Sequence, residues 1–442
     1  MKRDFYLQQL LERLGNGLIK VITGIRRCGK SYLVFTLFKN HLLGERGVPP
    51  ERIITLALDD DSNSRLRNPR LLGEYLRERI TSRNERFYVL IDEIQYCYRI
   101  KRDDIDESQV APEDRDSLYI TFYDVLNGLL HLGNVEVYVT GSNSRMLSDD
   151  VKTIFRGRGD EIRIHPFSFA EYHSCIQGDR LDEWDDYLTY GGMPLAVLER
   201  NEARRRTYLN SLYEEVYLKD LVERNDIRDL PLLESLLDVL SSSVGSLTNP
   251  TRLANALNSA NRQKDTTANT IEQYIRHLTQ AYLFSKARRY DVKGKKYLET
   301  PYKLYSEDVG IRNARLNWRQ QERTHLMENV IYNELVRLGY AVDVGVVNVE
   351  SRKGGVREMR QHEIDFVINQ GFERIYIQSA FTMETEEKRN QEVLPFRHCR
   401  DAFRKVIVSG GTEKLWKDEE GFAHIGVVPF MLNAGEVLPS TQ

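Results

Sequence analysis

The stretch Gly24-Ile25-Arg26-Arg27-Cys28-Gly29-Lys30-Ser31 follows a short apolar run, residues 18–23 (LIKVIT), and precedes residues with helical apolar spacing, 31–43 (SYLVFTLFKNHLL). It matches the pattern G-x-x-x-x-G-K-[ST] in the strand, loop and helix context that this pattern requires. Glycines at both ends let the backbone curl so that successive N–H groups point at phosphate oxygens, at the positive end of the next helix. We therefore predict a triphosphate-binding loop made of Gly24, Ile25, Arg26, Arg27, Cys28, Gly29, Lys30, Ser31 and Tyr32.

The roles of the last loop residues follow from their chemistry. Lys30 is expected to neutralise the β- and γ-phosphate oxygens, and Ser31 is expected to bind Mg²⁺. A second apolar run, Tyr88 to Ile91, ends in the carboxylates Asp92 and Glu93. We predict that Asp92 holds Mg²⁺ through its hydration shell and that Glu93 activates the attacking water as a general base. The alternative is that this acidic pair caps the following helix.

Four further candidates for the surroundings of the γ-phosphate lie downstream. The run from Asn134 to Thr140 (NVEVYVT) ends in polar residues, and of these Asn143, with Ser142 beside it, is expected to sense the γ-phosphate or to position water. Either residue could instead cap a helix. Arg156 and Arg158 lie on a glycine-flanked loop, from which one guanidinium could reach the γ-phosphate of a neighbouring chain in a homo-oligomer. An ion pair within the chain is the alternative.

The pattern of strands and helices predicts an α/β protein. Strand-like runs at residues 52–58, 86–91 and 134–140 alternate with helical patterns, which indicates a parallel sheet. The segment 101–117 (KRDDIDESQVAPEDRDS) is largely charged and reads as a surface insert. The chain has 442 residues, enough for about three domains.

Composition excludes several classes of protein. The chain has 63 basic and 66 acidic residues, so its net charge of −3 excludes a globally basic nucleic-acid coat. Its four cysteines are far apart and are expected to be free thiols. The chain has no uninterrupted apolar run of about 18 residues, so we expect a cytoplasmic protein without a membrane span.

The motifs GIRRCGKS, YVLIDEIQ, VTGSNSRML, YLTYGGMP and YLKDLVERND together resemble a prokaryotic family of AAA-type ATPases. Members of that family carry a C-terminal domain of unknown function related in shape to restriction-endonuclease-like folds. The resemblance implies a P-loop sheet with an additional strand, a preference for ATP, and a winged-helix module in the middle of the chain. It implies three domains: an AAA-type P-loop ATPase domain at 1–175, a helical connector with the winged helix at 176–315, and a nuclease-like domain at 316–442.

The middle module contains a helix-turn-helix pattern within residues 248–278, with Arg276 and His277 facing outward. A predicted hairpin follows it and carries Lys286, Arg288, Arg289, Lys293, Lys295 and Lys296. These cations could contact the phosphates of double-stranded DNA in a salt-sensitive, largely sequence-neutral way. A lid or a protein-docking unit remains the alternative.

In the C-terminal domain, Glu328, Asp365 and Gln378 fit the first three positions of a nuclease-like metal site, which are an acid, an Asp and a Glu or Gln. Ala380 stands where the activating lysine is expected, and nothing in the sequence shows whether Lys388 reaches the site from the next helix. We therefore expect a catalytically degenerate domain.

The sequence as a whole predicts an Mg²⁺-dependent ATPase that binds and hydrolyses ATP and that loads onto or remodels DNA. Two alternatives stay open: a nucleotide-dependent switch that regulates or scaffolds protein partners, and an ATP-gated nuclease.

Overall fold

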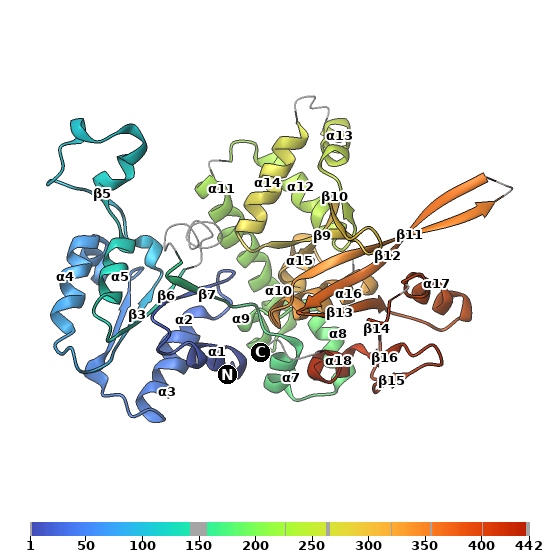
Figure 1. Cartoon of the computed structure of the whole chain (residues 1–442), viewed down its shortest axis with the longest axis horizontal. Helices are drawn as coiled ribbons and strands as arrows, with labels where there is room; N and C mark the ends of the chain where they lie inside the picture. Colours follow the sequence, from blue (N-terminus) through green and yellow to red (C-terminus); the bar gives the residue numbers. More distant parts are fainter. Residues whose placement is uncertain are drawn as a thin grey trace. The chain divides into compact units, whose positions relative to one another are not determined.

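The computed structural model describes residues 2–141, 157–225, 227–261, 266–319, 321–353, 356–399 and 401–438. The chain divides into two compact units, residues 1–165 and residues 166–442 (Figure 1). Each unit is built around its own β-sheet. No helix in the described part of the chain combines the length and the apolar composition that crossing a membrane requires.

The first unit contains a five-stranded sheet in the order β2-β3-β6-β1-β7, and all of its strands are parallel. The bounds are β1 (Ile19–Thr23), β2 (Ile53–Ala57), β3 (Phe87–Asp92), β6 (Val135–Thr140) and β7 (Gly159–Arg163). The four predicted strands are confirmed, and β6 is the additional strand between β1 and β3. β1, β3 and β6 are buried along their whole length, as expected for inner strands of a parallel sheet that helices cover.

The helices of the first unit include one long run after the predicted loop. That run is α-helical at both ends and π-helical between, with bounds α2 (Lys30–Tyr32), the π-helical segment Leu33–Phe38 and α3 (Lys39–Gly44). The others are α1 (Asp4–Glu12), α4 (Pro69–Arg79) and α5 (Phe122–Leu130). The charged insert forms a two-stranded excursion, β4 (Ile100–Lys101) and β5 (Tyr119–Ile120), with short 3₁₀ turns between (Figure 1).

The second unit begins with a helical connector and continues with a helix, a short strand, two helices and a hairpin. The connector contains α7 (Phe169–Ile176), α8 (Arg180–Tyr190), α9 (Pro194–Leu198), α10 (Glu202–Ser211), the π-helical segment Leu212–Leu218 and α11 (Lys219–Asn225). The middle elements are α12 (Leu230–Ser242), β8 (Leu247–Thr248), α13 (Pro250–Asn261), α14 (Ala268–Gln280), β9 (Phe284–Asp291) and β10 (Lys296–Ser306). Thr267 accepts a hydrogen bond from the Thr270 N–H and so begins α14 where the sequence predicts that helix.

The rest of the second unit is a mixed α/β region. It contains α15 (Val309–Arg315), α16 (Arg323–Arg337), β11 (Val342–Lys353), β12 (Val356–Gln370), β13 (Glu373–Ala380), α17 (Glu386–Arg397), β14 (Arg404–Ser409), β15 (Trp416–Lys417), β16 (Ala423–Gly426) and α18 (Val427–Leu432). β11 and β12 form a hairpin that extends beyond the sheet (Figure 1). The sequence predicts only its inner half, because the outer half is charged and lacks the apolar pattern of a buried strand.

One nine-stranded sheet runs through the second unit in the order β15-β16-β14-β13-β12-β11-β9-β10-β8. The hairpin of the middle module joins the C-terminal strands because β9 pairs in parallel with β11, with Tyr290 opposite Gly345. One hydrophobic core cluster extends from Phe167 through Tyr305 and Phe366 to Leu438, and a second cluster contains Tyr290, Val347 and Phe396. The expected boundary between the middle domain, ending at residue 315, and the C-terminal domain, beginning at residue 316, therefore falls inside the second compact unit.

The paired glycines of the YLTYGGMP motif allow two segments of backbone to lie in close contact. A Cβ on Gly192 would lie 2.1 Å from the carbonyl oxygen of Phe167, so only glycine fits there. Phe167 N donates to Gly192 O at 2.7 Å, and Gly192 N donates to the Asp308 carboxylate at 2.7 Å. Asp308 also accepts from Ile311 N at 3.0 Å and so caps α15. This motif is therefore explained by packing.

Asp308 gives the second unit a pH-dependent stability. Burial raises the pKa of Asp308 to about 6 from an ordinary 3.8, against the opposing hydrogen bonds from backbone N–H groups. An acid with a raised pKa in the folded state contributes stability that is complete below its unfolded pKa and is lost as the pH rises through about 6.

We therefore expect the wild type to gain stability relative to Asp308→Asn by about 1 kcal/mol between pH 8 and pH 5. The measurement is urea unfolding of both proteins at several pH values, in which the titration of all other groups cancels. A difference between the two proteins that does not change with pH would show that Asp308 is already ionised in the folded state.

Candidate functional site

The loop after β1 has the strained, curled backbone that the motif predicts. Gly24 has a φ of 132°, and a Cβ there would lie 2.1 Å from the carbonyl oxygen of Ile164. Gly29 has a φ of 100° and Arg27 a φ of 62°, which is uncommon for a residue with a side chain. Cys28 Sγ donates to Ile164 O at 3.4 Å and ties the loop to the chain that follows β7. The loop is therefore held in one conformation before α2 begins.

Lys30 lies inside this loop and is 4% exposed. Its Nζ atom donates to Gly24 O and Ile25 O, each at 3.0 Å, so the ammonium lies within the curl of the backbone. A positive charge and backbone N–H groups at a helix N-terminus are the donors that bind phosphate. The geometry thus fits the role that the sequence predicts for Lys30.

The carboxylate of Asp92 faces the loop from the end of β3. Ser31 Oγ donates to Asp92 Oδ1 at 3.0 Å, and the hydroxyl of Thr140, at the end of β6, donates to the same oxygen. Burial raises the pKa of Asp92; the bonds from Thr140 and Ser31 oppose this, and the charges of Glu93 and Asp59 add to it. A hydroxyl and a buried carboxylate at this distance are the donor pair of an Mg²⁺ site beside a phosphate loop.

Glu93 lies next to this pair in a left-handed conformation, with a φ of 49°. Its N–H donates to Thr140 Oγ1 at 3.1 Å, and one of its carboxylate oxygens accepts a hydrogen bond from Gln95 Nε2. The Glu93 side chain makes no capping hydrogen bond to the following turn. Strained backbone at the end of a buried strand is typical of functional residues.

Thr140 and Gln95 are the site residues that sequence reasoning missed. A usable signal existed for Thr140, because it ends a predicted strand and the carboxyl ends of parallel strands meet at one edge of the sheet. Gln95 gave no such signal, since its role depends on the turn after Glu93.

The γ-phosphate candidates fall in two places. Ser142, Asn143 and Arg156 lie outside the described residues. Arg158 is exposed and precedes β7, where its carbonyl oxygen accepts from Ile19 N at 2.9 Å. Because β1 and β7 are parallel, Arg158 lies at the amino end of the sheet, about 16 Å of strand away from the loop. Arg163, which pairs with Thr23, lies instead at the carboxyl end of β7, next to the loop. The sequence did not predict the charged strand β7.

The N-terminal segment stabilises the loop through hydrogen bonds from Arg3. Arg3 is 1% exposed and donates to Cys28 O and to His165 O, both at 2.8 Å. Its guanidinium lies 4.5 Å from the ring centre of Tyr6, and the Tyr6 hydroxyl accepts from His165 N at 3.2 Å. Arg3 thus connects the loop to the end of β7.

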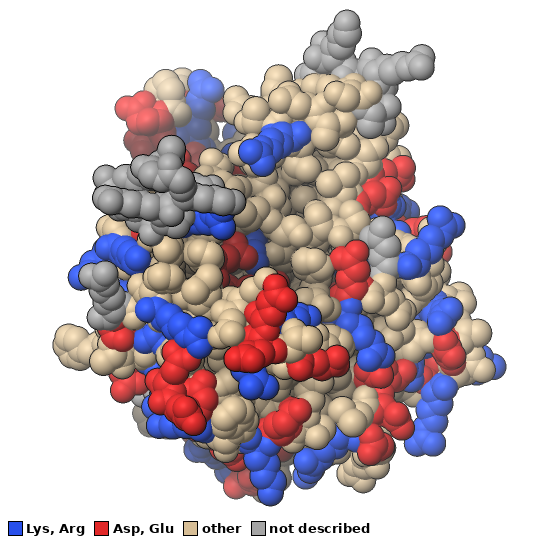
Figure 2. Space-filling view, turned by 90° about the vertical axis from the view of Figure 1, so that its right-hand side faces the viewer, with Lys and Arg blue, Asp and Glu red and all other residues tan. Residues whose placement is uncertain are grey.

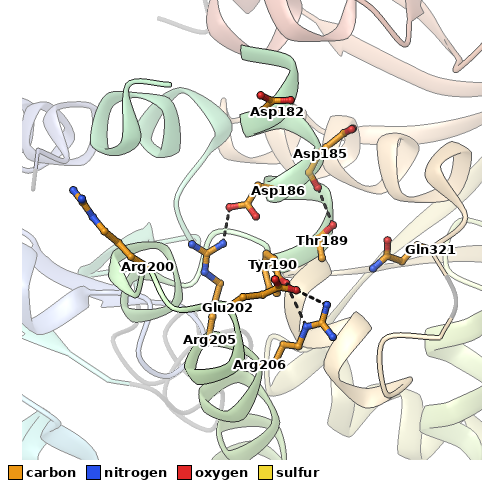
Figure 3. Close-up of a pocket in the computed structure, with 10 residues that line it drawn as sticks. All are labelled: Asp182, Asp185, Asp186, Thr189, Tyr190, Arg200, Glu202, Arg205, Arg206 and Gln321. Atoms are coloured by element: carbon orange, nitrogen blue, oxygen red, sulfur yellow. Dashed lines mark hydrogen bonds and ion pairs between the residues drawn. The ribbon is translucent and has the colours of Figure 1, made fainter. Parts of the chain in front are cut away.

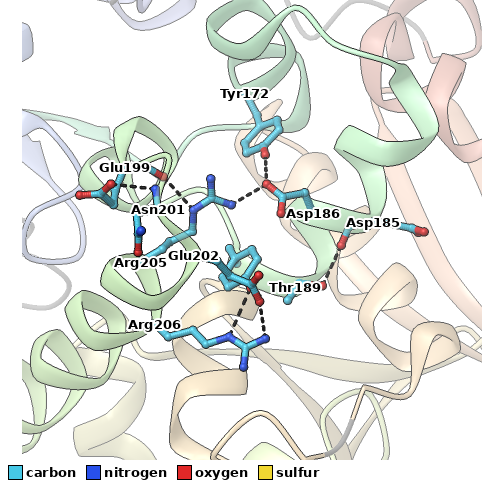
Figure 4. A network of polar contacts seen from close by, with 10 residues as sticks. Tyr172, Asp185, Asp186, Thr189, Glu199, Asn201, Glu202, Arg205 and Arg206 are labelled. Atoms are coloured by element: carbon cyan, nitrogen blue, oxygen red, sulfur yellow. Dashed lines mark hydrogen bonds and ion pairs between the residues drawn. The ribbon is translucent and has the colours of Figure 1, made fainter.

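A cavity of about 550 Å³ lies on the helical connector (Figure 3). Two of its cations are paired within the chain: Arg205 bonds Asp186 at 2.5 Å and Glu199 O at 3.0 Å, and Arg206 bonds Glu202 at 2.6 Å (Figure 4). The Tyr172 hydroxyl donates to Asp186, and the Tyr190 hydroxyl donates to Glu202 at 2.5 Å. This network braces α8 against α10, and we interpret it as structural.

Much of the predicted basic hairpin is engaged within the second unit. Lys286 forms an ion pair with Glu272 at 2.9 Å, Arg289 is buried and bonds Gln361 at 3.1 Å, and Lys293 donates to Asn348 O at 2.9 Å. Exposed cations remain at Arg276, Arg288, Lys295 and Lys296, and the Arg288 guanidinium lies 4.4 Å from the ring centre of Tyr297. Figure 2 shows one face of the protein, on which basic and acidic side chains are interspersed over the described residues.

The nuclease-like positions are partly brought together. Glu328 and Asp365 both lie near Lys303 of β10, with nitrogen-to-oxygen distances of 2.8 and 3.8 Å. Gln378 Nε2 instead donates to Glu392 at 3.0 Å, and Ala380 is buried at the end of β13. Lys388 Nζ donates to Thr382 Oγ1 at 2.5 Å on the surface.

Two parts of the chain match known families. Residues 16–173 match the family described as "AAA domain", and residues 181–322 match "Domain of unknown function (DUF8612)". A Haemophilus influenzae relative named "Uncharacterized protein" is 30% identical over 439 residues and the match covers 98% of each chain. The chain belongs to the family of this protein. Its first unit is an AAA-type P-loop domain.

The chain is also similar to a second, more distant protein. "Uncharacterized protein MJ1544" of Methanocaldococcus jannaschii is 24% identical over 434 residues, which is 93% of this chain and 87% of that protein. Among solved structures, the Aeropyrum pernix ORC2 protein has a TM-score of 0.39 at 13% identity, covering 75% of this chain and 93% of that one. Cdc6p of Pyrobaculum aerophilum has a TM-score of 0.29 at 12% identity, covering 72% and 95%. At these scores the likeness carries no information on function.

The contacts of Arg3 predict an unusual dependence of the loop on the N-terminus. Arg3→Ala leaves two buried carbonyl oxygens without their donor, so we expect a loss of about 2–4 kcal/mol of stability in the first unit. Hydrogen exchange of residues 24–32 should become faster.

The matched control is Arg13→Ala, which removes a partly exposed ion pair with Asp160 at 3.1 Å. That change should cost less than about 1 kcal/mol. Equal exchange in the loop of both variants would contradict the role of Arg3.

Proposed function

We propose that the protein binds ATP with Mg²⁺ and hydrolyses it. The observation that carries this proposal is the hydrogen bond of 3.0 Å between Ser31 and Asp92, which places a loop hydroxyl and a buried carboxylate side by side next to the Lys30 ammonium. The AAA domain match over residues 16–173 supports the same activity. We further propose a cytoplasmic location, where ATP and Mg²⁺ are both available.

The chain's own residues divide the work of hydrolysis. The N–H groups of the loop and Lys30 bind and orient the phosphates, and Ser31 with Asp92 holds Mg²⁺. Mg²⁺, when bound, neutralises charge that develops on the phosphate oxygens. Glu93 accepts a proton from the attacking water. Its hydrogen bond to Gln95 is a contact that must weaken before the carboxylate can turn toward that water.

The remaining γ-phosphate roles are proposals as well. Asn143 is proposed to position the water, and one of Arg156 or Arg158 to stabilise the transition state. Arg158 lies at the amino end of the sheet. If the role falls to Arg158, its guanidinium therefore acts at the site of a second copy of the chain and not at its own. The proposal therefore includes a homo-oligomer.

We propose double-stranded DNA as the macromolecular partner, which the protein loads onto or remodels. The order α12, β8, α13, α14, β9 and β10, with β10 between β8 and β9, supports our proposal that this module is a winged helix. Arg276 on α14 and Lys295 and Lys296 at the hairpin turn are exposed on that module.

A switch that acts on protein partners is the second candidate. It is favoured by the ion pair between Lys286 and Glu272, which neutralises a cation of the proposed DNA surface.

Two substitutions separate nucleotide binding from hydrolysis. Lys30→Ala should abolish ATP binding, measured by calorimetry, because the loop loses its ammonium. Glu93→Gln should still bind ATP but lose turnover by about 100-fold or more in a phosphate-release assay. Equal ATP binding by the wild type and Lys30→Ala would refute the assignment.

The DNA proposal predicts that the double variant Lys295→Glu, Lys296→Glu binds duplex DNA at least about tenfold more weakly at low salt than the wild type. DNA-stimulated hydrolysis should fall with it. The control carries the same charge change at the exposed edge residues Lys414 and Lys417 and should behave as the wild type. Hydrolysis that duplex DNA leaves unchanged in the wild type would favour the protein-partner switch.

A further inference from the structure

A continuous row of aromatic rings and guanidinium groups crosses the sheet of the second unit. The Arg288 guanidinium lies 4.4 Å from the ring centre of Tyr297, and the Tyr297 ring packs edge-on against Tyr290 with 5.4 Å between ring centres. The Arg374 guanidinium lies 5.0 Å from the ring centre of Tyr290 and 5.4 Å from that of Phe403. These five residues, which we call the aromatic row, come from β9, β10, β13 and the segment just before β14.

The aromatic row spans two strands that contribute no ring to it. β11 and β12 lie between β9 and β13 in the sheet (Figure 1). Tyr290 pairs with Gly345 of β11, and paired residues of neighbouring strands face the same side of a sheet. Gly345 has no side chain on that side, and a Cβ there would lie 2.7 Å from Val367 of β12. The Tyr290 ring and the Arg374 side chain therefore extend over these strands and meet.

Hydrogen bonds fix the central members of the aromatic row. Arg374 Nη2 donates to the Tyr290 hydroxyl at 3.2 Å, so one guanidinium contacts this ring both through its face and through its oxygen. The Tyr297 hydroxyl donates to Asp343 Oδ2 at 3.0 Å, and Asp343 is buried. Because these side chains are already ordered, a ligand that packs on them loses little affinity to the entropy of ordering them.

The two ends of the aromatic row are open to solvent. Tyr297 is 50% exposed and Phe403 is 37% exposed. Phe372, in the turn between β12 and β13 and two residues from Arg374, is fully exposed. Single exposed apolar side chains are common on protein surfaces, whereas several that gather on one surface mark a binding site. The aromatic row and Phe372 together form such a surface.

Cations surround the end of the aromatic row at Tyr297. The hairpin segment from residue 292 to residue 298 contains Lys293, Lys295 and Lys296 and no acidic residue, and all three lysines are exposed. Lys293 donates to the carbonyl oxygen of Asn348 at 2.9 Å, a contact with a neutral group that leaves its charge in place. Positive charge beside exposed rings suits a ligand that is both anionic and aromatic.

We propose that the aromatic row is a binding surface for single-stranded DNA. Bases stack on the exposed rings of Tyr297, Phe403 and Phe372. Arg288 and the lysines of the hairpin turn contact phosphates. A single strand fits this surface because each of its bases can present a free aromatic face, whereas in a duplex neighbouring bases cover those faces.

The aromatic row is continuous with the proposed duplex-binding module. Tyr297 directly follows Lys295 and Lys296 on the same hairpin, so a strand separated from a duplex at that hairpin lies next to the first ring of the row. The choice of DNA over RNA rests on the proposed function. The stacking surface itself requires only an unpaired nucleic acid strand.

The test measures binding of a labelled oligothymidylate of about 20 nucleotides to the full chain by fluorescence anisotropy, without ATP. We expect Tyr297→Ala, Phe403→Ala and Phe372→Ala each to weaken binding about fivefold or more, because each removes one stacking ring. Phe372 is fully exposed, so its variant tests stacking without a risk to the fold.

Two further variants serve as controls. Tyr297→Phe keeps the ring but loses the hydroxyl, so it should bind oligothymidylate as the wild type does. Tyr98→Ala removes an aromatic side chain that is 52% exposed in the first unit and should also behave as the wild type.

Three ligands complete the experiment: an abasic oligonucleotide of the same length, an oligouridylate and a DNA duplex. The abasic strand should bind at least about fivefold more weakly than oligothymidylate, because it carries the phosphates without the bases. Equal binding of these two strands, or unchanged binding by all three alanine variants, would overturn the stacking surface. Tighter binding of the oligouridylate than of oligothymidylate would overturn the assignment to DNA.

The duplex separates this proposal from the proposed function. Phe403→Ala and Phe372→Ala should bind duplex DNA as the wild type does, whereas the double variant Lys295→Glu, Lys296→Glu should lose it. A wild type that binds oligothymidylate but no duplex would refute the proposed duplex partner and support the aromatic row as a single-strand site. A wild type that binds the duplex but no single strand would refute the aromatic row alone.

Discussion

The hydrogen bond between Ser31 and Asp92 is the contact on which the first unit depends. It connects the start of the helix after β1 with the end of β3, although β6 lies between these two strands. The bond forms because all strands of the sheet are parallel, so that their carboxyl ends meet at one edge. Thr140, at the end of β6, completes the contact by bonding the same carboxylate.

Supporting contacts hold this edge from outside the sheet. Arg3 joins the loop to the chain after β7, and Gly24 allows the backbone of that chain to approach closely. The loop is thus held by backbone carbonyls on one side and by the Asp92 carboxylate on the other. Because the loop is already ordered, binding of a phosphate would not require a further loss of its conformational entropy.

In the second unit, the strand β10 contacts different elements through its two faces. One of its faces bonds α14 through Tyr302, and the other contacts acids of α16 and β12 through Lys303. The parallel pairing of β9 with β11 makes this arrangement rigid, since the hairpin belongs to the same sheet as β12.

The sequence by itself determined the phosphate loop, the acids at the end of β3, four of the five strands of the first sheet and the helix after Thr267, because these depend on local patterns of apolar residues, glycines and caps. It did not reveal β7, whose charged residues lack a strand pattern. It also did not show that Arg158 lies at the amino end of the strands and not at their carboxyl end. Only the tertiary structure decided that Lys303 stands among Glu328, Glu363 and Asp365. The physical reason is that long-range strand pairing brings together residues that no local spacing connects.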